Sequence, residues 1–212
     1  MTVDDLLRHY KERKDEIQAR LAEFPLVYKK GDLAIFKELC FCILTANTSA
    51  KMGITCIEAF GDDIKTADLE GLQNTLCGRY RFWRVRPTYI IHTRDYLMQE
   101  TGFKIKEKLD SLTDFHERRD FFAANKGIKG IGYKEASHFL RNIGYSGYAI
   151  LDKHIVNMLF ELGVLPTNDK PANRKKYVEI EDRLREFSDM IGIDMDEMDL
   201  ALWSYKTGVI LK

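Results

Sequence analysis

Apolar residues recur every three or four positions through most of the chain, with polar and charged residues between them. In the first segment, residues 3–23, the apolar positions are Leu6, Leu7, Tyr10, Ile17 and Leu21. This spacing predicts an amphipathic helix with one face against a core. We expect the helix to end at Phe24-Pro25, because proline lacks a backbone N–H and its ring opposes the preceding turn.

The same periodicity predicts helices along the rest of the chain, separated by glycine, proline and short polar residues. We place them at about residues 33–46, 49–61, 68–76, 87–99, 104–112, 114–125, 133–143, 153–163, 177–191 and 195–208. Asp32, Asp152 and Asp194 stand where helix N-caps are expected. We find no convincing strand pattern, so the fold is predicted to be all-α.

Composition allows a sizeable core but gives no overall charge. The hydrophobic share is 45%, and 33 basic residues balance 33 acidic ones for a formal net charge of +0. This balance counts mildly against nucleic-acid binding, because phosphate neutralisation dominates that affinity. The charges are uneven, however: four arginines crowd into residues 79–86, and nine acidic residues lie in 179–199. The pattern indicates one basic face and one acidic face.

The four cysteines, Cys40, Cys42, Cys56 and Cys77, have the spacing of no zinc or iron–sulfur site. We expect them to be reduced and buried, and we expect no metal and no other cofactor. The first residues are too polar for a signal peptide or a membrane span. The protein is therefore expected to be intracellular, cytoplasmic or nucleoid-associated, without membrane contact.

A glycine-rich hairpin, residues 127–132, separates two predicted helices. Its three glycines let the backbone turn tightly and approach another surface closely. The first N–H groups of the helix that follows have no partner within that helix. We expect them to point outward and unpaired, a geometry that suits a phosphate.

Two segments carry a family resemblance. Residues 130–136 resemble the hairpin of the helix-hairpin-helix DNA glycosylase superfamily, and residues 144–152 resemble its Gly/Pro-rich loop, which ends in an aspartate. The chain departs from the pattern at Lys129, where the family usually has proline, and its loop contains no proline. The short chain without a cysteine cluster is most similar to the compact archaeal-type 8-oxoguanine DNA glycosylase/AP lyase group.

The resemblance implies a nucleophile and a carboxylate. Lys134 matches the family lysine that attacks the sugar C1′ and forms a Schiff base, and Asp152 matches the carboxylate that stabilises positive charge on the sugar. Other interpretations remain open. Asp152 is a good helix cap, Lys134 can be a solvated surface residue, and Lys129 competes for the nucleophile role, although hairpin lysines more often serve phosphates.

The resemblance also implies contacts with duplex DNA. Asn47 matches the residue that fills the space left by a flipped base, and Tyr80 and Arg81 match a turn that wedges the duplex and contacts the orphaned base. Arginines interleaved with aromatics also suit phosphate and base contacts. Ordinary surface turns are the alternative for both segments. Lys129, Gly130 and Gly132 are the expected hairpin contacts to the backbone.

The last helix and the final residue complete the expected site. In the family that this sequence resembles, an aromatic of the last helix shapes the base pocket and a terminal lysine lies beside the flipped purine. Trp203 and Lys212 stand at these positions. A frayed, solvated terminus is the alternative for Lys212.

We therefore expect a helix-hairpin-helix glycosylase fold with two helical lobes flanking a DNA-binding cleft. Residues 32–134 would form the central barrel lobe, and residues 1–31 with 135–212 the second. The expected activity is excision of 8-oxoguanine from double-stranded DNA with AP lyase cleavage, by a monomer. A bifunctional glycosylase for oxidised pyrimidines and a non-catalytic helix-hairpin-helix DNA-binding module are the alternatives.

Overall fold

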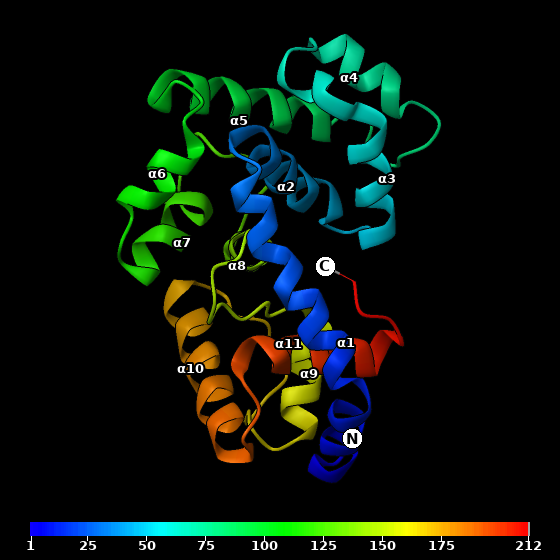
Figure 1. Cartoon of the computed structure of the whole chain (residues 1–212), viewed down its shortest axis with the longest axis vertical. Coiled ribbons are helices and arrows are strands. Elements are labelled where there is room, and N and C mark those ends of the chain that lie inside the picture. The colour runs from blue at the N-terminus through cyan, green and yellow to red at the C-terminus, as the bar shows by residue number, and fades with distance from the viewer. Residues whose placement is uncertain (212) are drawn as a thin grey trace. The chain divides into compact units, whose positions relative to one another are not determined.

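The computed structural model describes residues 1–211, and all regular secondary structure within that range is helical (Figure 1). The elements are α1 (Val3–Lys29), α2 (Asp32–Thr45), α3 (Ala50–Phe60), the 3₁₀ helix η1 (Gly61–Lys65), α4 (Leu69–Leu76), α5 (Arg86–Thr101), α6 (Ile105–Ser111), α7 (Phe115–Ala123), α8 (Tyr133–Asn142), α9 (Lys153–Glu161), α10 (Arg174–Ile191) and α11 (Met195–Thr207). The all-α prediction is confirmed.

The chain divides into two compact units. The continuous unit comprises residues 26–139, and the discontinuous unit comprises residues 1–25 with the chain from residue 140 onward. One boundary falls inside α1, between Pro25 and Leu26, and the other inside α8, between Phe139 and Leu140. Each unit buries its own apolar core.

Helix α2 is the core of the continuous unit and packs against α3, α5 and α6 (Figure 1). Its fully buried apolar side chains are Ile35, Phe36, Leu39, Cys40, Phe41, Cys42, Ile43 and Leu44. A helix that is apolar on every side needs neighbours on every side. The later helices of this unit therefore surround it, and the hairpin is built on one of them, α5.

In the discontinuous unit, α11 packs against both α9 and α10. Met198, Leu200, Ala201 and Leu202 are buried along α11. The caps of all three helices are side chains that accept backbone N–H bonds, from Asp152, Asn173 and Asp194. The predicted caps at Asp152 and Asp194 are thus confirmed.

The predicted end of the first helix is wrong, because α1 continues through Pro25 to Lys29. Contacts on both sides of the proline explain this. Phe24 is buried beneath the Arg141 guanidinium, 5.2 Å from its ring centre. Beyond the proline, the Tyr28 hydroxyl donates to the Lys106 carbonyl at 3.4 Å. These contacts hold the helix together where local propensity alone would end it.

The predicted cap at Asp32 is also different. Asp32 is the first residue of α2, and Gly31, with φ of 89°, occupies the cap position. The Asp32 carboxylate accepts instead from the Lys106 N–H at 2.8 Å. Its oxygen therefore satisfies a donor in the first turn of α6, a helix without a side-chain cap of its own.

Cys40, Cys42 and Cys56 are buried free thiols as expected, whereas Cys77 is exposed. Cys77 lies outside the core because it follows the end of α4 in a surface turn. Among residues 1–211 there is no group of three or more side chains suited to a metal ion. None of the described helices is both long enough and apolar enough to cross a membrane.

Gly144 supplies a stability test. It has φ of 97°, and a Cβ there would lie 2.7 Å from Pro25 Cα. Gly144→Ala should therefore lose about 2–4 kcal/mol of unfolding free energy, from backbone strain plus overpacking. Gly163→Ala is the matched control, since Gly163 has φ of 75° but nothing within 4 Å of a Cβ. It should lose only about 1 kcal/mol. Equal losses in chemical denaturation would show that the Gly144–Pro25 approach is not a constraint.

Candidate functional site

The glycine hairpin is docked on α5. The Lys129 N–H donates to Thr93 Oγ1 at 3.0 Å, and the Asn125 side-chain amide donates to the Tyr96 hydroxyl at 2.7 Å. A Cβ on Gly127 would lie 2.2 Å from the Tyr96 ring, so only glycine allows this approach. The hairpin thus has a fixed seat on a long helix.

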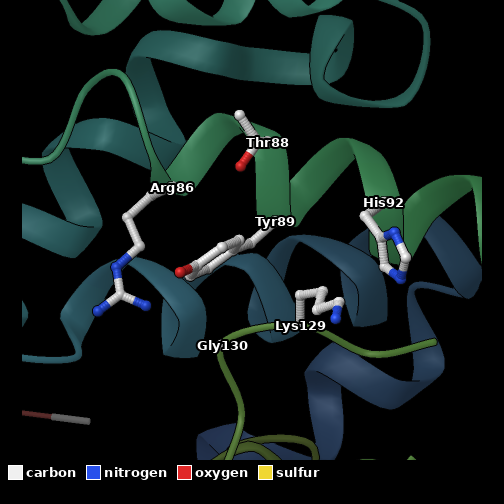
Figure 2. Close-up of a pocket in the computed structure, with 6 residues that line it drawn as sticks. All are labelled: Arg86, Thr88, Tyr89, His92, Lys129 and Gly130. Atoms are coloured by element: carbon white, nitrogen blue, oxygen red, sulfur yellow. The ribbon is translucent and has the colours of Figure 1, made fainter. Parts of the chain in front are cut away.

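Gly130 makes the second close approach. Its φ is 77°, and a Cβ there would lie 2.7 Å from the Tyr89 ring and 3.1 Å from Arg86 Nη1. Figure 2 shows Arg86, Tyr89 and His92 on α5, with Lys129 and Gly130 on the adjacent hairpin. Residues of both segments line a pocket of about 590 Å³: Arg86, Thr88, Tyr89, His92, Lys129 and Gly130. Its two permanent cations suit an anion.

The start of α8 differs from the expected unpaired amides. The Gly132 N–H donates to Glu135 Oε2 at 3.2 Å, so an internal carboxylate occupies it. Glu135 is the third residue of α8 and reaches back as in a capping box. Its other oxygen, Oε1, lies 3.0 Å from Lys134 Nζ. The side chains of Lys134 and Glu135 are 30% and 18% exposed.

Buried contacts fix α8 against α7. The Arg119 side chain, 1% exposed, reaches Ser137 Oγ at 3.5 Å, and its guanidinium lies 6.0 Å from the Tyr133 ring centre. The Phe122 and Phe139 rings lie 4.7 Å apart. Lys134 therefore sits on a helix held by core packing, as precise positioning of a reactive group requires.

Two predicted contact turns lie together in the continuous unit. Asn47 is exposed and has φ of 63°, an uncommon conformation for a non-glycine residue. In the second turn, Arg81 is exposed, with its guanidinium 5.0 Å from the Phe82 ring centre. Tyr80 is 2% exposed, and its hydroxyl donates to the Leu44 carbonyl at 2.7 Å. Burial raises the pKa of Tyr80 to about 12. Tyr80 thus anchors the turn beside the end of α2.

Arg86 joins these turns to the hairpin. Its Nη2 donates to the Ala46 carbonyl at 3.1 Å, next to Asn47. Its guanidinium lies 5.6 Å from the Phe82 ring and 5.4 Å from the Tyr89 ring. From the sequence, Arg86 was predicted only as one of the four arginines in residues 79–86. Its position in the first turn of α5, before Pro87, was the available signal.

Asp152, the predicted carboxylate of the site, lies in the discontinuous unit at the start of α9. Its Oδ1 accepts the His154 and Ile155 N–H groups, both at 2.8 Å. Within residues 1–211 no hydrogen bond to Oδ2 occurs. Half-buried Trp203 lies nearby, its ring centre 6.1 Å from that of His154. Lys212 lies outside the described residues.

Side chains hold the loop that leads to Asp152. The N–H groups of Gly147, Ala149 and Ile150 donate to the carboxylates of Asp196, Glu181 and Asp199, respectively. The Leu151 N–H donates to the Tyr177 hydroxyl oxygen. The Arg185 guanidinium also donates to the Gly147 carbonyl at 3.2 Å. This loop is therefore fixed by side chains of α10 and α11.

The acidic segment 179–199 was predicted to form a surface face, but two of its carboxylates are buried. Glu181 is 0% and Asp199 3% exposed. Asp199 forms a buried ion pair with Arg141 while it accepts from the loop. Burial raises the pKa of Asp199 to about 6, although Arg141 opposes the shift. The spacing of Asp196 and Asp199 on one side of α11 was the missed signal.

The all-helical fold, with its glycine hairpin between α7 and α8, is of the helix-hairpin-helix glycosylase class. The chain belongs to the 8-oxoguanine DNA glycosylase family, whose model matches residues 17–193. It is 41% identical over 202 residues to the 8-oxoguanine DNA glycosylase/AP lyase of Methanocaldococcus jannaschii, covering 95% of this chain and 94% of that relative. It is 38% identical to the protein of that name from Korarchaeum cryptofilum, with 100% of both chains covered.

A solved structure agrees with these relatives. The crystal structure of the Methanocaldococcus jannaschii 8-oxoguanine glycosylase/lyase, in complex with a 15mer DNA containing 8-oxoguanine, superposes with a TM-score of 0.87. It is 39% identical to this chain, and the match covers 98% of this chain and 99% of that one. The predicted helix-hairpin-helix glycosylase fold and family membership are confirmed.

The Asp199 site predicts a pH dependence of stability. A carboxyl whose pKa is raised on folding stabilises the folded state fully below its ordinary pKa of 3.8, and this contribution is lost as pH rises through about 6. Asp199→Asn removes that titration. The unfolding free energy of the wild type, relative to that of this variant, should therefore fall by up to about 3 kcal/mol between about pH 4 and pH 7.

Urea denaturation at both pH values measures that difference. Asp182→Asn, at an exposed position on the same acidic segment, controls for loss of one surface charge. A gap that stays constant, or that widens toward neutral pH, would contradict the raised pKa of Asp199.

Proposed function

We propose that this protein removes 8-oxoguanine from double-stranded DNA and then cleaves the strand at the abasic site, as a base-excision-repair glycosylase with AP lyase activity. The full-length similarity to a glycosylase/lyase solved with 8-oxoguanine DNA carries the proposal. The local geometry of Lys134 and Asp152 supports it, since each is held on a packed helix of its unit.

Lys134 would be the nucleophile. Its neutral amine attacks the sugar C1′, and the electrons of the C1′–N bond leave with the base, which takes up a proton. The resulting amine-linked sugar opens to a Schiff base, and loss of a C2′ proton then expels the 3′ phosphate by β-elimination. Hydrolysis of the Schiff base then releases the sugar and regenerates the Lys134 amine.

Asp152 would stabilise the positive charge that develops on the sugar as the base departs. Its capping bonds support this assignment, because Oδ1 is committed to α9 and so fixes the whole carboxylate. Fixed charges stabilise a transition state without reorganising during the reaction.

The residues that we assign to DNA contacts lie in the continuous unit. We assign Asn47 to the space left by the flipped base and Arg81 to the orphaned base, since both are exposed on turns tied to Arg86. Tyr80 would act through this turn as its anchor. Lys129, Gly130 and Gly132 would meet backbone phosphates, and the cationic pocket beside the hairpin supports that role.

Trp203 would form part of the base pocket, since its ring offers a stacking surface. The ring lies beside the His154 imidazole, and the His154 backbone N–H donates to Asp152 Oδ1. Lys212 remains a sequence-based prediction for the same pocket. We propose a monomer that acts on chromosomal DNA, and therefore in the cytoplasm at the nucleoid.

Lys134→Gln tests the activity directly. It removes the amine but keeps a side chain of similar polarity, so borohydride trapping on 8-oxoguanine duplex should fall below detection while duplex binding persists. Lys129→Gln should still give the trapped adduct at saturating DNA. Normal trapping by Lys134→Gln would transfer the nucleophile role to another lysine. A wild-type preference for oxidised pyrimidines over 8-oxoguanine in the same assay would change the assigned substrate.

Asp152→Asn separates the cap from the charge. Asparagine also caps helices well, so the free energy of unfolding, measured by thermal melting, should change by less than about 1 kcal/mol. Single-turnover excision should fall about 100-fold or more, because a charge facing the transition state is lost. Near wild-type excision in this variant would reduce Asp152 to a structural cap.

A further inference from the structure

Glu135 holds two groups of the proposed reaction with one carboxylate. Oε2 accepts from the Gly132 N–H at 3.2 Å, and Oε1 lies 3.0 Å from Lys134 Nζ. The first partner is a hairpin amide assigned to a DNA phosphate, and the second is the proposed nucleophile. The Glu135 carboxylate therefore occupies, within the protein, a position that an anion of the DNA backbone would take.

The two contacts depend on each other. Adjacent residues of a helix point about 100° apart, so Lys134 and Glu135 do not face each other by helix geometry alone. Glu135 meets Lys134 because its side chain turns back toward the helix start, where the Gly132 N–H holds it. A Cβ on Gly132 would lie 3.3 Å from Oε2, tighter than most such contacts, so glycine leaves room for the carboxylate.

A phosphate and this carboxylate compete for the hairpin. Both are anions that accept the same N–H, and like charges at hydrogen-bonding distance repel each other. Meanwhile the ion pair restrains the Lys134 side chain beside Glu135, and a nucleophile must be free to align with the sugar C1′. Docking of a phosphate at Gly132 would therefore displace Glu135 and with it the partner of the ammonium.

We propose that Glu135 couples DNA docking at the hairpin to release of Lys134 from its ion pair. It is a positioning residue that restrains Lys134 in the free protein, and its ion pair with Lys134 breaks when the hairpin binds the DNA strand. This inference rests on the proposed function, and it adds to it a residue whose charge opposes both binding and attack until substrate is in place.

Glu135→Gln is the discriminating variant. Glutamine keeps an oxygen that can accept from Gly132 but removes the charge. Binding to a duplex with a non-cleavable abasic analogue should tighten about 3-fold, as expected for loss of one weak, partly exposed ion pair. Glu179→Gln is the matched control, because Glu179 also pairs with a lysine, Lys176 at 2.7 Å, on the surface of α10. It should not change the affinity.

The dependence of borohydride trapping on the concentration of abasic-site duplex gives the second readout. At subsaturating DNA the trapping rate reports the free protein, and at saturating DNA it reports the complex. In Glu135→Gln the rate at subsaturating DNA should rise about 3-fold. The rate at saturating DNA should equal that of the wild type, because docking has already separated the wild-type pair.

Each other outcome overturns the inference. An equal rise in the trapping rate at subsaturating and at saturating DNA means that the ion pair survives docking, and no rise at either concentration means that Glu135 does not restrain Lys134. Loss of trapping with normal melting would make the carboxylate part of the chemistry. Glu135→Ala, which empties the Gly132 N–H, should behave as Glu135→Gln and replaces it should that variant misfold. Absence of any adduct with wild-type protein would instead contradict the proposed function.

Discussion

Backbone N–H groups outside helices need acceptors, and this requirement governs both the glycine hairpin and the loop before Asp152. The loop before Asp152 has no strand or helix to satisfy its amides. Acidic side chains and a tyrosine from α10 and α11 satisfy them instead. Charged acceptors make stronger bonds than neutral ones, but they must be buried to do so. The raised pKa of Asp199 is the consequence of that burial.

The hairpin meets the same requirement with weaker means. Thr93, Asn125 and Glu135 each accept one hairpin N–H, and only Glu135 is charged. Glycines at 127 and 130 bring the backbone onto Tyr96 and Tyr89, which leaves little space for rearrangement. The seat of the hairpin is therefore rigid, whereas the amide at the start of α8 is held by one partly exposed side chain that another anion can replace.

Periodicity predicted the helices because each buries one face, and the hairpin and loop motifs predicted Lys134 and Asp152 through family resemblance. The errors share a cause. Pro25 and Asp32 were interpreted from local propensity, but contacts from distant residues decide both positions. Arg86, Glu135 and Asp199 were missed as site residues because a charged side chain is usually solvated, and sequence alone gives no indication of the backbone group that it meets.

The two proposed reacting groups are held in opposite ways, and their chemistry explains the difference. A carboxylate stabilises a developing charge best when it does not reorganise during the reaction. The loop before Asp152 is fixed accordingly, because side chains accept hydrogen bonds from four of its backbone N–H groups, at residues 147, 149, 150 and 151. A lysine nucleophile must instead pass from a paired ammonium to a free amine. A single adjacent carboxylate, itself held by one hairpin amide, restrains it only until an anion arrives. Asp152 is thus held rigidly, as charge stabilisation requires, and Lys134 is held by a contact that can be broken, as nucleophilic attack requires.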